Sequence, residues 1–137
     1  MTRSLAFLGV LLCLAACSDQ GSKPADGNGD GTVSFAGDVQ PIFTASCASG
    51  SCHGGAAPAL GLTLASGASY AAIVERPSLQ RPQLLLVHPG QPDSSYLYLK
   101  VVGAAGIDGA RMPIGGALSA ASTETLRDWI ARGAPSN

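Results

Sequence analysis

The most informative stretch of the chain is Cys47-Ala48-Ser49-Gly50-Ser51-Cys52-His53. Two cysteines are separated by four small residues, and a histidine follows the second cysteine directly. Thiols and an imidazole grouped in this way can form a disulfide, bind a metal ion or attach a cofactor. Two further features help to choose among these three possibilities: the compartment of the protein, and the other side chains that could bind a metal.

The N-terminus indicates the compartment. Met1-Thr2-Arg3 gives a positive start, and residues 5–16 form an apolar run of signal-peptide length, shorter than the roughly 20 residues of a bilayer span. The segment Leu14-Ala15-Ala16-Cys17 resembles the lipobox of bacterial lipoproteins, in which the cysteine is lipidated and becomes the new N-terminus. An ordinary secretory signal with an incidental cysteine is the alternative. We predict a signal peptide at residues 1–16, lipidation of Cys17, and a membrane-anchored protein of the bacterial envelope that faces the periplasm or the cell exterior.

This interpretation accounts for the four cysteines. Cys13 lies in the segment predicted to be cleaved, and Cys17 takes the lipid. Cys47 and Cys52 therefore remain in the folded part, in an oxidising compartment where free thiols are uncommon.

Residues 17–34 are rich in Gly, Asp and Ser, and predict a flexible tether. Within it, Asp26, Asn28 and Asp30 resemble the start of an EF-hand calcium loop. Gly37, however, occupies the position of the bidentate Glu, and no helix-like segment precedes the loop. We favour a solvated linker and keep calcium binding as a side hypothesis.

Residues 35–137 are expected to form one all-α domain of short helices. Asp38 is a candidate N-cap of a first helix, with apolar positions running through Phe43 to Cys47. A short helix is predicted over 69–75, and Asp93 is a candidate cap for a helix through 95–102.

The last helix is predicted from Ser122 as its cap to Gly133 as its end, with Leu126, Trp129 and Ile130 on one face. No alternating pattern typical of a strand is present. The loops between these helices are long, which is unusual in a compact domain unless another component organises them.

Composition restricts the partners. Charged residues make up 12% of the chain, the formal net charge is −1, and no basic stripe suits nucleic acid. Aromatic residues make up only 5%, so a large apolar cofactor would help to fill the core.

The segment 35–137 resembles a small monohaem c-type cytochrome domain of class I, in a Cys-x4-Cys-His variant. Besides the cysteine–histidine stretch, the matching pieces are Asp38-Val39-Gln40-Pro41-Ile42-Phe43, Gly54-Gly55, Pro89-Gly90-Gln91-Pro92, Ser95-Tyr96-Leu97, Met112-Pro113, Trp129-Ile130 and Gly133-Ala134. The resemblance implies a cytochrome c-like fold of short helices and long loops wrapped around one covalent haem c. In that family the first and last helices cross beside the haem.

The resemblance also implies roles for single residues. Cys47 and Cys52 would form thioethers to the haem vinyl groups, and His53 would be an iron ligand. Met112, the only methionine left after signal removal, is the expected second axial ligand, with His88 as its rival and core packing as the alternative. A backbone carbonyl near Pro58 is expected to accept from the histidine ring.

We therefore predict a lipid-anchored electron carrier that serves redox partner proteins of the cell envelope. Nothing in the sequence resembles a catalytic triad, a carboxylate pair or a phosphate-binding loop, so an enzyme is not expected. Two alternatives remain: a sensor or binding module with five-coordinate haem, and a haem-free interaction lipoprotein with a Cys47–Cys52 disulfide. A structural zinc site would need four ligands, and only His88 could add to the motif.

Overall fold

The computed structural model describes residues 31–137. The predicted signal peptide, the lipidation site Cys17 and the possible calcium ligands Asp26, Asn28 and Asp30 lie outside the described residues. Within the described part the protein is helical and has no β-strand, only the isolated bridges Val74–Val87 and Pro77–Leu85. The all-α prediction is confirmed at this level.

The first helical segment begins earlier than predicted. A π-helical turn, η1 (Phe35–Val39), runs directly into α1 (Gln40–Ser46). Ser34 is the N-cap, since its hydroxyl accepts from the Gly37 N–H, while the Asp38 carboxylate accepts from the Ser34 N–H at 2.7 Å. The prediction of Asp38 as N-cap was wrong, because Ser34 satisfies the first free N–H groups from one turn earlier.

The two middle helices also start or stop at other residues than predicted. Helix α2 (Ser69–Ile73) ends two residues early, because the backbone of Val74 is already extended, with ψ at 125°. Asp93 lies within the 3₁₀ turn η3 (Pro92–Ser94), so the N-cap of α3 (Tyr96–Val102) is Ser95. A second 3₁₀ turn, η2 (Ala59–Gly61), follows the cysteine–histidine stretch.

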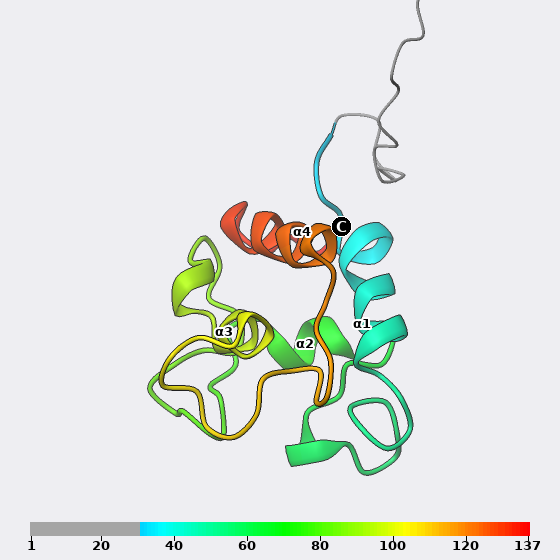
Figure 1. The fold of residues 1–137 in the computed structure, drawn as a ribbon. Helices are drawn as coiled ribbons and strands as arrows, with labels where there is room; N and C mark the ends of the chain where they lie inside the picture. Colours follow the sequence, from blue (N-terminus) through cyan, green and yellow to red (C-terminus); the bar gives the residue numbers. More distant parts are fainter. Residues whose placement is uncertain (1–30) are drawn as a thin grey trace, which may run out of the picture.

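The last helix, α4 (Ala120–Ala131), is capped by Ser119, whose hydroxyl accepts from the Ser122 N–H. It therefore begins one turn before the predicted cap Ser122, and it ends as predicted before Gly133. In Figure 1, α4 lies across the N-terminal helical segment, and the long loops gather at the opposite end of the molecule.

In the core, side chains from the first and last helical segments pack against each other. The Phe35 ring packs 5.2 Å from Trp129 and 5.1 Å from Tyr70, between ring centroids. The C-terminal residue returns to the start of η1, where the Asn137 side chain accepts from the Phe35 N–H at 3.0 Å. The first and last helical segments thus pack together, chiefly through η1 and α4.

No helix in residues 31–137 is long and apolar enough to cross a membrane.

Candidate functional site

A large pocket lies among the loops and the inner sides of α1 and α3. Its volume is about 810 Å³, within the range of roughly 300–1,000 Å³ typical of ligand sites. Most of its lining is apolar, including Phe43, Leu64, Leu97, Val101 and Leu118. Such a space in a small domain is suited to a bulky, largely apolar ligand.

The pocket brings together the four residues that the sequence singled out for haem. Cys47, Cys52, His53 and Met112 all line it, although 59 positions separate the last two along the chain. The rival ligand His88 is not among the lining residues, and its Nδ1 lies 3.2 Å from the Ser94 hydroxyl in a separate turn.

The orientation of the His53 ring is fixed by a carbonyl group. Its Nδ1 lies 3.0 Å from the Leu62 carbonyl oxygen, which can only accept, so Nδ1 carries the proton. In the neutral ring the lone pair is then on Nε2. A histidine held in this way is the usual form of a metal ligand, because the second contact sets both tautomer and ring orientation.

The expected contact near Pro58 is therefore made by a different residue. The Pro58 carbonyl accepts from the Gly61 N–H at 2.8 Å, which closes the turn η2. This turn returns the chain so that Leu62 faces the histidine. A second bond, from the Leu64 N–H to the His53 carbonyl at 2.7 Å, keeps the two segments side by side.

The two glycines after His53 are sterically required. A Cβ on Gly54 would lie 2.0 Å from the Ala48 carbonyl oxygen, and one on Gly55 would lie 2.3 Å from that of Gly50. The loop between the cysteines therefore folds back on the backbone that follows it. This tight return accommodates the four-residue gap between Cys47 and Cys52.

The two cysteines differ in environment. Both are free thiols in the structure; Cys47 is half-buried and Cys52 is exposed. Burial, with a smaller contribution from the nearby Cys52, raises the pKa of the Cys47 thiol to about 11. The Cys47 thiol thus stays protonated near neutral pH.

Met112 lies on a part of the lining that is built from a loop. Its backbone N–H donates to the Lys100 carbonyl at 2.9 Å, and the neighbouring Arg111 side chain donates to the Val101 carbonyl at 2.8 Å. Both acceptors belong to the last turn of α3. The methionine is thereby attached to a helix, although its own segment has no regular structure.

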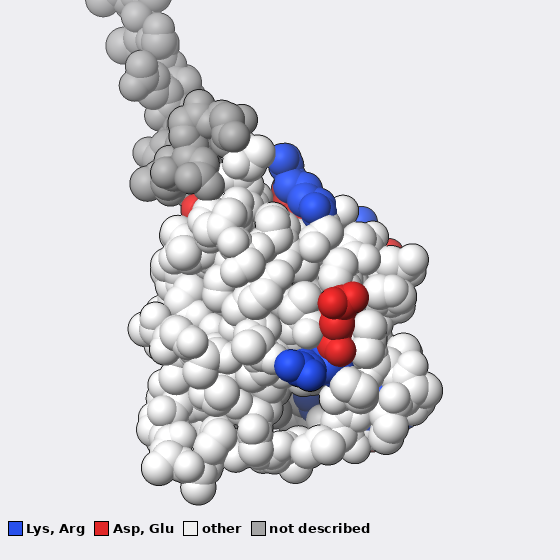
Figure 2. All heavy atoms as spheres, turned by 180° about the vertical axis from the view of Figure 1, so that it is seen from behind, with Lys and Arg blue, Asp and Glu red and all other residues white. Residues whose placement is uncertain are grey.

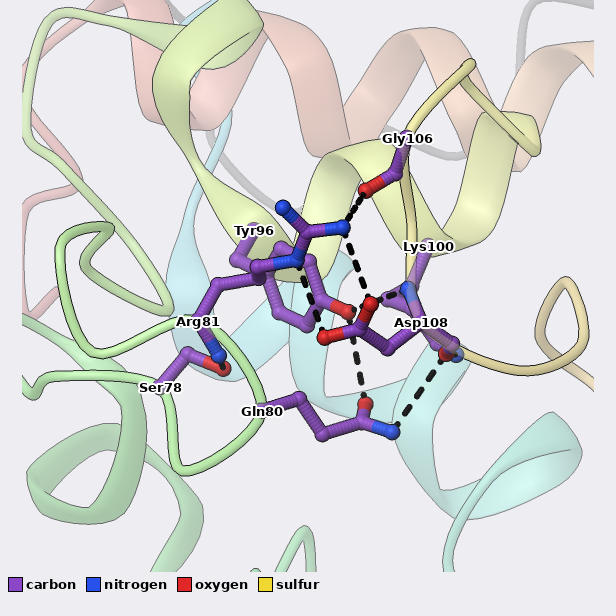
Figure 3. A network of polar contacts seen from close by, with 7 residues as sticks. All are labelled: Ser78, Gln80, Arg81, Tyr96, Lys100, Gly106 and Asp108. Carbon is purple, nitrogen blue, oxygen red and sulfur yellow. Dashed lines mark hydrogen bonds and ion pairs between the residues drawn. The ribbon is translucent and has the colours of Figure 1, made fainter.

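The loop that leads to Met112 is also held by a polar network around Asp108 (Figure 3). The Asp108 N–H donates to the Tyr96 hydroxyl at 3.0 Å, and its carbonyl accepts from Lys100 Nζ at 2.6 Å. Its carboxylate pairs with Arg81 at 2.9 Å, and Gln80 donates to its carbonyl at 3.3 Å. No sequence motif predicts this network, because its members are spread along the chain from Gln80 to Asp108.

The described residues contain no group of three or more His, Cys, Asp or Glu side chains that could hold a metal ion. His88 does not join Cys47, Cys52 and His53 in the pocket. The structure therefore does not assemble the four ligands that the zinc alternative requires.

Comparisons with known proteins give little further information. No protein-family model matches the chain, and no curated protein matches it. Among solved structures, Kuenenia stuttgartiensis hydrazine synthase is similar with a TM-score of 0.47 and 22% identity. The match covers 75% of this chain and 16% of that one.

Proposed function

We propose that this protein is a lipid-anchored monohaem cytochrome c that transfers single electrons between redox partners of the cell envelope. The observation that carries the proposal is the presence of Cys47, Cys52, His53 and Met112 on the walls of one apolar pocket. The first two would hold haem c covalently, and the other two would be the axial ligands of its iron. When bound, haem supplies one-electron redox chemistry.

The chemistry of the donors supports this assignment. An imidazole with Nδ1 tied to a carbonyl has Nε2 free for a metal, and a thioether opposite it is a known second ligand of cytochrome c iron. Most of the remaining lining is apolar. The protein would hold the iron and exclude solvent, with no substrate chemistry of its own.

The surface near the pocket also suits a carrier. Three large apolar side chains that line it are well exposed: Leu60, Leu79 and Ile114, the last two at 76% and 75%. Exposed apolar groups of this kind are typical of surfaces that contact other proteins. On the face shown in Figure 2, charged side chains are few and gather in small groups.

The deciding experiment is a spectroscopic one. The full-length chain is produced together with a cytochrome c maturation system, and reduced-minus-oxidised visible spectra are recorded. We expect the α-band of haem c and a haem that stays attached under denaturing conditions. A wild-type product without covalent haem contradicts the proposal and favours the haem-free lipoprotein, for which a Cys47–Cys52 disulfide would then be sought.

The axial pair is tested by Met112→Ala, with His88→Ala as its control. Met112→Ala should lower the reduction potential and alter the reduced spectrum, because thioether ligation favours ferrous iron. His88→Ala should leave both unchanged, since His88 lies outside the pocket lining. If Met112→Ala changes neither quantity, the five-coordinate alternative is favoured.

A further inference from the structure

Lys100 is in an unusual position for a cation. It lies on α3, lines the pocket and is only 7% exposed. One of its three ammonium N–H groups donates to the Asp108 carbonyl. No other acceptor is found for it within residues 31–137, and the Asp108 carboxylate is paired with Arg81 instead.

A buried positive charge without a counter-charge is unfavourable, because the interior solvates it poorly. The described part of the protein supplies Lys100 with one neutral carbonyl and no carboxylate within about 4 Å. The missing negative charge must come from elsewhere. The pocket that Lys100 lines is the available source.

Some of the polar residues that line the pocket belong to the Asp108 network with Lys100 (Figure 3). They are Ser78, Gln80 and Tyr96. The Tyr96 hydroxyl is already engaged with the Asp108 N–H and, at 3.5 Å, with the Gln80 carbonyl oxygen. Within this network, Lys100 is the cation that no carboxylate of the described residues pairs with.

We infer that Lys100 forms a carboxylate-binding subsite of the pocket, so that the ligand is a largely apolar molecule with a carboxylate at this corner. The subsite offers one positive charge and two free N–H groups, which match a singly charged carboxylate. The inference rests on the proposed function in one respect: if the ligand is haem c, the carboxylate is one of its propionates.

Arg76 provides the contrast within the same pocket. It also lines the pocket, but its side chain is exposed and its Nε donates to the Ala71 carbonyl at 3.0 Å. Water screens a charge in that position. Arg76→Met is thus the matched control for Lys100→Met: each removes one pocket-lining cation, only one of which is buried.

The test uses the matured full-length protein and the propionate bending vibration in its resonance Raman spectrum. This band shifts when a propionate loses a charge-assisted hydrogen bond. We expect a shift in Lys100→Met, none in Arg76→Met, and a band close to wild type in Lys100→Arg. An unshifted band in a Lys100→Met protein that is fully loaded with haem overturns the inference.

A crystal structure of the matured wild type provides a test that does not need the variant to fold. Lys100 Nζ is expected within about 4 Å of a propionate oxygen. A haem bound with both propionates away from Lys100 contradicts the subsite alone. A wild type that carries no haem contradicts the proposed function as well, so the two failures can be told apart.

Discussion

The two walls of the pocket, one bearing His53 and the other Met112, are held in place by different means. The His53 wall, residues 47–64, is fastened by backbone bonds within itself, such as Leu64 N–H to the His53 carbonyl. The Met112 wall has a backbone bond from the Met112 N–H to the Lys100 carbonyl. Its other contacts come from side chains at distant positions, with Arg81, Tyr96 and Lys100 all converging on Asp108.

Because of this difference, the two walls should respond differently to substitutions. A wall built from short-range backbone bonds tolerates most side-chain changes but no added atom where the backbone closes on itself. A wall held by side chains should lose stability in small steps as each contact is removed. Substitutions in each wall therefore test this difference.

The largest effect is expected from Gly54→Ala on the His53 wall. The new Cβ would lie 2.0 Å from the Ala48 carbonyl oxygen, so backbone must move, at a cost of at least about 3 kcal/mol, the upper end of typical overpacking. Urea unfolding measures the loss. Gly50→Ala is the control, because a Cβ there meets nothing within 4 Å; equal stabilities of the two variants would contradict the described loop.

A smaller effect is expected from Tyr96→Phe on the Met112 wall. It keeps the buried ring but removes the hydroxyl that accepts from the Asp108 N–H, at a cost of about 1–2 kcal/mol in unfolding free energy. Chemical denaturation provides the value. In the matured protein the same change should weaken Met112 ligation, seen as a lower reduction potential. A potential equal to wild type would mean that Asp108 does not position the methionine loop.

The smallest effect is expected from Arg81→Gln. Its ion pair with Asp108 joins two partly exposed side chains, at 34% and 45%, and pairs of this kind contribute little to stability. The midpoint of urea unfolding should change less than in Tyr96→Phe, and added salt should reduce the difference from wild type. A loss larger than that of Tyr96→Phe would show that the ion pair, rather than the buried hydroxyl, holds the loop.

Local patterns in the sequence predicted the helices, and the first residue of α2, but not where the first and last helices begin. The apolar spacing around Phe43 and Trp129 was sufficient to place the first and last helices. Their caps were each misassigned, to Asp38 and Ser122, because a Ser three or four residues earlier competes for the same N–H groups. Sequence alone could not choose between neighbouring polar residues of similar capping ability.

The candidate site likewise has features that the sequence predicts and features that only the structure shows. The sequence by itself predicted a cofactor-attachment stretch at Cys47–His53 and singled out Met112, because thiol, imidazole and thioether groups are rare in this chain. Only the tertiary structure decided that Leu62, not Pro58, accepts from the histidine, and that Lys100 is buried in the pocket wall. Both depend on how loops with no periodic pattern close on one another, and that closure is set by long-range contacts that no local motif encodes.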